Sequence, residues 1–173
     1  VTALIVINVD WFFYSHFLYY AKVLKASGIR VIVACQDTGK APSIISEGLE
    51  FDEIVTHRSS IGIVDNAVYF WALWRLCRKI KPDVIEFITI KPIIFGGILN
   101  RFFKLPQKNS VFYISGLGYI FNELSKKNLL NTFVRKYLYP FAIRGKDKRF
   151  IVENKSDENI IRQFFKKEIN SKI

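Results

Sequence analysis

Apolar segments of strand length alternate with stretches of helical periodicity along the whole chain. The first segment, Thr2–Val9, is an almost continuous apolar run, which is typical of a central strand buried on both faces of a parallel sheet. Five further segments have the composition of strands: Arg30–Cys35, Phe51–Val55, Asp83–Ile88, Ser110–Ile114 and Arg149–Glu153. Strands separated by helices predict an α/β fold, a doubly wound parallel sheet of about six strands in the order 3-2-1-4-5-6.

Helices are expected in the connections between these strands. Ser15 is the predicted N-cap of the first helix, which ends before Gly28, and Ser156 is the predicted N-cap of the last. Asp65 caps a helix that Pro82 ends. The other predicted helices are Pro42–Glu47, Pro92–Phe103 and Leu129–Ile143. At 173 residues the chain fits one Rossmann-like domain that spans residues 1–173.

Composition narrows the class of protein. Hydrophobic residues make up 50% and charged residues 24% of the chain, which excludes disordered and fibrous proteins. Cys35 and Cys77 lack metal-ligand spacing and only 2 His residues are present, so no metal is expected. No uncharged apolar run reaches the length of a membrane span. No basic residue precedes the apolar N-terminal run, so the segment does not have the pattern of a signal peptide.

The net charge of +11 is distributed unevenly. Residues 1–74 carry 5 basic and 7 acidic side chains, whereas residues 75–173 carry 21 basic and 8 acidic side chains. One side of the fold is therefore expected to face an anionic partner. Nucleic acid, an anionic membrane and a phosphorylated substrate all fit this charge, as does a basic face that water alone covers.

The loop after the first strand, Asn8–His16, is the first candidate site, because ligands bind at the carboxyl ends of strands in such sheets. The loop contains no glycine, which argues against a dinucleotide cofactor, and no phosphate-binding GxxxxGK[ST] motif occurs in the chain. Asp10, Ser15 and His16 would lie near a helix N-terminus, where anions are favoured. Alternatively, His16 only packs against the aromatic residues of the loop.

Two more candidate loops follow the fourth and fifth predicted strands. Lys91 begins a helix, a position where the helix dipole disfavours a cation unless a phosphate is bound. The segment Ser115-Gly116-Leu117-Gly118 offers glycines whose backbone a ligand can approach closely. An exposed lysine and an ordinary tight turn are the simpler interpretations of these two features.

Basic and aromatic residues alternate between Lys126 and Arg149, where 8 basic residues accompany a single acid, Asp147. Apolar residues there follow helical spacing, so the pattern predicts an amphipathic helix suited to the surface of an anionic membrane. The residues expected at the membrane are Lys126, Lys127, Arg135, Lys136, Tyr137, Phe141 and Arg144. Nucleic-acid binding and a core helix with solvated lysines are the alternatives.

Four motifs together resemble the N-terminal domain of GT-B glycosyltransferases of the family-4 type, most closely bacterial enzymes that extend polyprenyl-diphosphate-linked sugars. They are NVDWFFYSH (Asn8–His16), DVIEFITIKP (Asp83–Pro92) followed by Gly96-Gly97, SGLGYIF (Ser115–Phe121) and FIVEN with Asp157. Two departures stand out: Phe17 occupies a position where the family often has Arg, and Glu86 and Ile88 occupy positions where it often has His.

The resemblance implies half of a retaining, metal-independent enzyme of bacterial surface polysaccharide or glycan synthesis, in which this domain binds a lipid-linked acceptor. A second domain, not represented in these residues, would hold the nucleotide-sugar co-substrate; no other cofactor is implied, and the domain alone would be inactive. Asp10 and His16 are the implied catalytic residues, which orient the acceptor hydroxyl. The implied substrate-binding residues are Asn8, Ser15, Lys91, Ser115, Gly116 and Gly118.

The resemblance also implies a cytoplasmic protein, peripheral on the inner face of the cell membrane, with no nucleic acid as partner. Two alternatives stay open from the residues alone. One is a complete non-catalytic subunit that presents the lipid acceptor to a separate catalytic chain. The other is a Rossmann-like module that binds nucleic acid.

Overall fold

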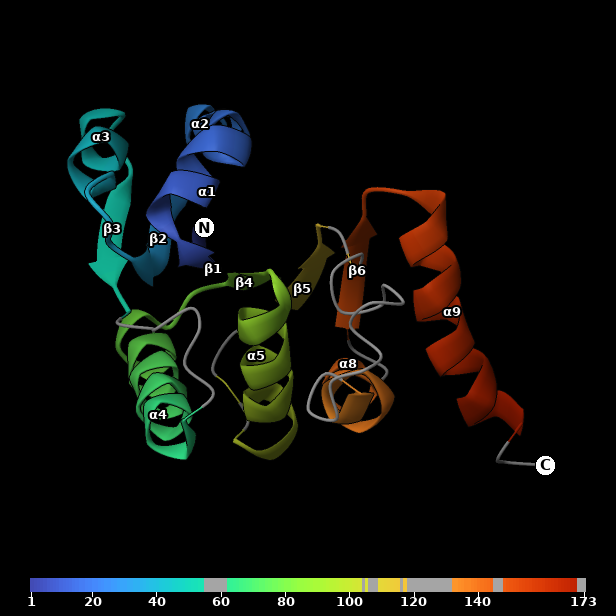
Figure 1. Cartoon of the computed structure of the whole chain (residues 1–173). Coiled ribbons are helices and arrows are strands. Elements are labelled where there is room, and N and C mark those ends of the chain that lie inside the picture. Colours follow the sequence, from blue (N-terminus) through green and yellow to red (C-terminus); the bar gives the residue numbers. More distant parts are fainter. Residues whose placement is uncertain are drawn as a thin grey trace.

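The structure is a computed structural model that describes residues 1–54, 62–103, 105, 109–115, 117, 132–144 and 148–170, with only the backbone of residues 63 and 164–170. In these residues six parallel strands form one sheet. The strands are β1 (Thr2–Val9), β2 (Arg30–Gln36), β3 (Glu50–Glu53), β4 (Val84–Ile88), β5 (Asn109–Ile114) and β6 (Lys148–Val152). Their order, β3-β2-β1-β4-β5-β6, confirms the predicted doubly wound topology (Figure 1).

Helices cover both faces of the sheet. One face carries α1 (Asp10–His16), α2 (Leu18–Ala26) and α3 (Ala41–Ser46), and the other carries α4 (Ile63–Ile80), α5 (Ile90–Phe102) and α8 (Tyr139–Ile143) (Figure 1). The last helix, α9 (Lys155–Asn170), follows β6 at the edge of the sheet. This division follows from right-handed crossovers on either side of the central strand β1.

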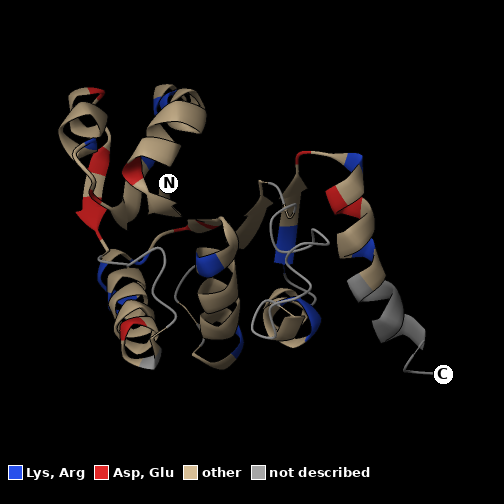
Figure 2. Cartoon of the chain, viewed as in Figure 1, with Lys and Arg blue, Asp and Glu red and all other residues tan. Residues whose placement is uncertain are grey.

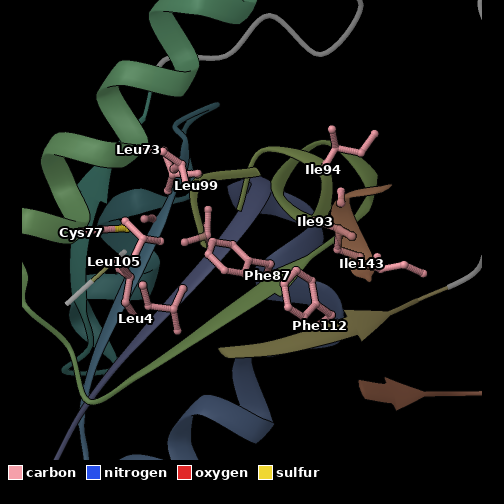
Figure 3. Packing of buried hydrophobic residues seen from close by; sticks show 14 of the residues in the cluster. Leu4, Leu73, Cys77, Phe87, Ile93, Ile94, Leu99, Leu105, Phe112 and Ile143 are labelled. Carbon is pink, nitrogen blue, oxygen red and sulfur yellow. The ribbon is translucent and has the colours of Figure 1, made fainter. Parts of the chain in front are cut away.

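The hydrophobic core has two halves, one on each side of the sheet. Leu4 and Val6 of β1 pack in the half beneath α4 and α5, together with Phe87 of β4 (Figure 3). Ile5 and Ile7 of the same strand pack in the half beneath α1, α2 and α3. Because successive side chains of a strand point to opposite faces, a strand covered on both faces must be apolar throughout, which explains the run Thr2–Val9.

The three predicted N-caps are wrong. Asp65 lies in the first turn of α4, whose N-cap is Gly62. The helix after β1 begins at Asp10, so Ser15 lies in its last turn, where Ser15 Oγ donates to the carbonyl oxygen of Trp11 at 2.8 Å. The buried residue Phe17 then separates α1 from α2. In α9 the cap is Asn154, whose Oδ1 accepts from the backbone N–H of Asp157 at 2.8 Å, instead of Ser156.

The predicted helix Leu129–Ile143 is confirmed only over its described part, which is helical from residue 132 and contains a π-helical turn, Val134–Leu138. Pro140 follows this turn at the start of α8. Proline has no N–H to donate and its ring collides with the carbonyl group four residues earlier, so the chain widens there. The predicted apolar stripe consequently divides: Val134 and Leu138 pack on the core, whereas Phe133 and Tyr137 are exposed.

Glycines let α5 approach its neighbours closely. A Cβ atom at Gly97 would overlap the carbonyl group of Ala142 in α8, and one at Gly96 would overlap the ring of Phe87 in β4. Both glycines lie in the interior of a helix, where glycine is unfavourable by about 1 kcal/mol relative to alanine. Their presence is therefore explained by packing, which holds α5 against the sheet and against α8.

Replacing Gly97 by Ala should lower the free energy of unfolding by about 1–3 kcal/mol, because the added methyl group overlaps backbone atoms that cannot rotate away. Chemical denaturation measures the difference. Tyr19→Ala on the exposed side of α2 is the control, with an expected change within about 0.5 kcal/mol. A Gly97→Ala variant as stable as the wild type would contradict the close approach of the two helices.

Candidate functional site

Buried polar atoms without a hydrogen-bond partner gather where three adjacent strands end. They are Asn8 Oδ1 at the end of β1, Thr89 Oγ1 directly after β4 and Ser115 Oγ directly after β5. Val6 pairs with Phe87, and Ile88 pairs with Tyr113, so the three ends lie side by side at the carboxyl edge, with the outer two about 10 Å apart. Buried polar groups in proteins are normally paired, and three unpaired groups at one edge therefore indicate a binding site.

Asp10, at the start of α1, is fully buried and its carboxylate is surrounded by donors. Oδ2 accepts from the backbone N–H groups of Thr38 at 2.8 Å and Lys40 at 2.6 Å, and Oδ1 accepts from the Thr38 hydroxyl at 2.5 Å. Burial alone would raise the pKa of Asp10, but these hydrogen bonds outweigh it and lower the pKa to about 2. The carboxylate thus ties the end of β1 to the loop after β2, with the geometry of a positioning residue.

His16 lies in the last turn of α1, not in the first turn of a helix as the sequence predicted. Its Nδ1 is 3.2 Å from the carbonyl oxygen of Phe12, and its ring packs on the Phe12 ring with the centroids 4.4 Å apart. Since a carbonyl only accepts, Nδ1 carries the proton in the neutral ring and Nε2 is left as an acceptor. Ring contacts from Phe12 to Phe17 and on to Tyr113 connect this histidine to the end of β5.

Lys91 occupies the first turn of α5, as predicted. Its Nζ lies 5.0 Å from the centre of the Tyr69 ring, and burial lowers the pKa of the lysine, while the Asp65 carboxylate acts in the opposite direction. Directly before the helix, Thr89 has φ of 70°, in the left-handed region that β-branched residues rarely adopt. Strained backbone at a strand end is typical of ligand sites.

Glu86 of β4 was noted in the sequence only as a departure from the related family. Its side chain is buried, and its Oε1 accepts a hydrogen bond of 2.6 Å from the Tyr20 hydroxyl of α2. Burial raises the pKa of this carboxyl group, although the Tyr20 bond acts against that. Glu86 Oε2 has no hydrogen-bond partner. The sequence signal that could have identified Glu86 is an acidic residue in the middle of an apolar strand.

Asp157 holds the backbone of Leu117, two residues after Ser115. The buried Asp157 carboxylate accepts from the backbone N–H of Leu117 at 3.1 Å and from the Asn154 side chain at 2.9 Å. Through these hydrogen bonds, Asn154 of the motif FIVEN and Asp157 connect the start of α9 to the backbone just after β5. Gly116 and Gly118 lie outside the described residues.

The structure brings Asn8, Asp10 and Ser115 to one edge, with Lys91 in the helix that starts there. Ser15 is exposed at the far end of α1. Of the predicted membrane residues, Tyr137 and Phe141 expose their rings beside Arg135, Lys136 and Arg144, whereas Lys126 and Lys127 lie outside the described residues.

Neither a metal cluster nor a membrane span is found in what the structure describes. No three His, Cys, Asp or Glu side chains in the described ranges gather closely enough to hold a metal ion. Of the helices built from those same residues, none combines the length and the apolar character needed to cross a bilayer.

A six-stranded parallel sheet in this order, with helices on both faces, defines the class of protein: an α/β domain of the doubly wound type. Residues 3–153 match the model of the family described as glycosyl transferase 4-like, and the chain belongs to this family. The expected resemblance to the N-terminal domain of a GT-B glycosyltransferase is thereby confirmed. Comparison with curated protein sequences finds no match.

Solved structures share the fold at low sequence identity. A protein described as a UDP-N-acetylglucosamine 2-epimerase from Listeria monocytogenes superimposes with a TM-score of 0.64 at 10% identity, over 94% of this chain and 42% of that one. The kitacinnamycin glycotransferase superimposes with a TM-score of 0.52 at 16% identity, over 83% of this chain and 38% of that one. A glycosyltransferase from Rickettsia africae superimposes with a TM-score of 0.50 at 12% identity, over 88% of this chain and 43% of that one. The chain therefore spans less than half the length of each of these proteins.

In the acid range, the free energy of unfolding of Asp10→Asn should depend less on pH than that of the wild type. The folded pKa of about 2 lies below the ordinary value of 3.8, so the carboxylate stabilises the fold above about pH 4, and this contribution of about 2 kcal/mol is lost as the pH falls toward 2. The difference in unfolding free energy between wild type and Asp10→Asn should narrow by that amount over this range.

Thermal or urea unfolding at a series of pH values measures this difference. Thr38→Val removes the hydroxyl bond that lowers the pKa of Asp10 most but keeps both backbone donors, so it should reduce the pH dependence without abolishing it. A gap between wild type and Asp10→Asn that stays constant from pH 5 to pH 2 would show that the hydrogen bonds do not stabilise the charged form.

Proposed function

We propose that this domain is the acceptor-binding half of a retaining, metal-independent glycosyltransferase whose acceptor is a lipid-linked saccharide. One observation carries the proposal: Asn8, Thr89 and Ser115 present unpaired polar atoms at the carboxyl edge of three neighbouring strands. A sugar has closely spaced hydroxyl groups that both donate and accept, and such a ligand can satisfy a row of mixed amide and hydroxyl groups.

In this proposal His16 contacts the acceptor hydroxyl that attacks the donor sugar. Its Nδ1 proton is directed to the Phe12 carbonyl, so Nε2 can accept the hydroxyl proton. Asp10 acts by position: it holds the turn from which α1 projects, because four donors, including its own neighbour Trp11, already occupy its oxygens. The negative charge that develops on the leaving diphosphate would be stabilised by preorganised donors, not by a covalent nucleophile.

Lys91 would meet a phosphate of the lipid-linked acceptor. The helix dipole and partial burial both disfavour its charge where it stands, and a phosphate would remove both costs. The nucleotide-sugar would be held mainly by a second domain, so this domain alone would not turn over. A lipid-linked acceptor further implies work at the inner face of a membrane, in surface polysaccharide or glycan synthesis.

Thr89→Val and Ser115→Ala, made in the transferase that contains this domain, test whether the unpaired polar atoms at the strand ends bind the acceptor. Each change removes a buried oxygen that has no partner in the free protein, so the free energy of unfolding should stay equal or rise by about 1 kcal/mol. The same oxygen is paired in the acceptor complex, so kcat/KM for the acceptor should fall about tenfold per variant.

Steady-state kinetics with varied acceptor and denaturant unfolding of each variant supply the two readouts. Ser27→Ala, on the surface just after α2, is the control and should change neither. Variants that gain stability and keep full acceptor kinetics would mean that the unpaired oxygens do not bind the acceptor.

Lys91→Ala should raise the KM for the lipid-linked acceptor about tenfold or more, since a charge-assisted bond to phosphate is worth about 1.5–3 kcal/mol. An acceptor analogue without phosphate should be used equally well by wild type and variant. Lys22→Ala, on the opposite face of the sheet, is the control. Unchanged kinetics of Lys91→Ala with the phosphorylated acceptor would rule out the phosphate contact.

A further inference from the structure

Exposed aromatic rings form a connected band across three helices on one face of the molecule. In α4, Trp74 and Trp71 have ring centres 5.5 Å apart, and the Trp71 ring lies 6.0 Å from that of Phe103, just after α5. The preceding residue, Phe102, stacks at 6.0 Å on Phe141 of α8. Trp71 is 46% exposed, Phe102 61% and Phe141 37%, so the band faces outward.

Cations are interleaved with these rings. Arg78 lies over the Trp74 ring at 5.3 Å, and Arg101 lies over the Phe141 ring at 4.5 Å. The other cations on α4, α5 and residues 132–144 are Arg75, Lys79, Lys91, Arg135, Lys136 and Arg144, while Asp65 is the sole acid in these segments. Figure 2 shows basic residues along these helices and acidic residues near α3 and on β3, where Asp52 pairs with Lys79 of α4 at 3.3 Å.

Trp74 also packs on the core, but the exposed rings of the band are not needed for the fold. The same helices already pack on the sheet through Leu73, Ile93 and Ile143, which point inward (Figure 3). On the outer side, Val64, Val68, Trp71 and Arg75 line one shallow groove, and Phe133, Tyr137 and Phe141 line another with Lys136. Large exposed apolar patches on soluble domains mark interaction sites, because leaving them in water is unfavourable.

We propose that the outer faces of α4, α5 and residues 132–144 form one surface that binds an anionic lipid bilayer. Tryptophan and stacked arginine suit the headgroup layer, where a ring meets acyl chains and a guanidinium meets phosphate. The surface extends beyond the segment that the sequence indicated, since α4 and the end of α5 contribute its central rings. It adds to the proposed function a membrane in which the lipid part of the acceptor would lie, and its biological role rests on that proposed function.

The charge and ring geometry argue against other occupants of this surface. A second copy of the chain would place the same cations against each other, because a two-fold interface brings a patch onto itself. Single-stranded nucleic acid needs ring faces open for stacking. Here Trp71 meets Trp74 and Phe103 nearly perpendicularly, at 89° and 83°, and Arg78 and Arg101 cover two of the faces.

The surface and the candidate site share α5. Lys91 is in its first turn at the carboxyl edge of the sheet, and Phe102 is its last residue, about 16 Å along the helix axis. A membrane on this face would therefore lie within reach of a phosphate held by Lys91. A lipid-linked acceptor could keep its chain in the bilayer while its sugar enters the edge site.

Co-sedimentation of the full chain with vesicles tests the proposal, without acceptor or donor. We expect binding to vesicles that contain phosphatidylglycerol and little binding to pure phosphatidylcholine. Arg78→Gln with Arg101→Gln should weaken binding about twenty-fivefold, at about fivefold per cation. Trp71→Ser with Phe102→Ser should weaken it about tenfold or more. Tyr19→Ser, an 81% exposed ring on α2 of the other face, is the matched control and should bind like the wild type.

Circular dichroism and the unfolding midpoint of each variant establish that the fold is intact. Equal recovery with both kinds of vesicle, or full binding by both double variants, would overturn the proposal. So would a dimer that light scattering detects without vesicles and that Trp71→Ser with Phe102→Ser abolishes. Because no acceptor is present, failure here leaves the edge site untouched, and loss of acceptor kinetics in Thr89→Val or Ser115→Ala leaves vesicle binding untouched.

Discussion

The buried carboxylate of Asp10 fixes the edge on which the candidate site is built. It joins the end of the central strand β1 to the loop after β2 through the N–H groups of Thr38 and Lys40, and it begins α1 at the same point. An ionised group can be buried only where donors replace its lost hydration, and here they hold its pKa at about 2. The direction of α1, and with it the position of His16, depends on this arrangement.

Sequence reasoning was accurate where a property depends on neighbours along the chain. The uninterrupted apolar run Thr2–Val9 required a central strand covered on both faces, and the strand order followed from right-handed connections. The predicted caps failed because the helices begin elsewhere: α1 begins at Asp10, directly after β1, and Asn154 is the cap of α9. The Asn154 bond joins residues only three positions apart, so a neighbouring asparagine took the place that Ser156 was expected to fill.

Within the candidate site, the sequence indicated Asn8, Lys91 and Ser115 but not Thr89 or the pairing of Glu86 with Tyr20. The first three stand at or just after the ends of apolar strand segments, a position visible in the sequence. Unpaired hydrogen-bonding atoms are visible only when every neighbour is placed, since Thr89 Oγ1 differs from any loop threonine solely by what surrounds it. The Tyr20–Glu86 bond joins residues 66 positions apart, beyond any local pattern.

The helix α5 connects the two surfaces for which functions are proposed. Its glycines bring it against Phe87 and Ala142, so that its inner side is committed to the core and only its ends and outer side can serve other contacts. One end supplies Lys91 to the strand edge, and the other supplies Phe102 to the aromatic band. In the proposed arrangement, the fixed length of α5 would set how far from the bilayer the reacting sugar lies. The spacing of the two sites would therefore select acceptors by the distance between their phosphate and the sugar that receives the transfer.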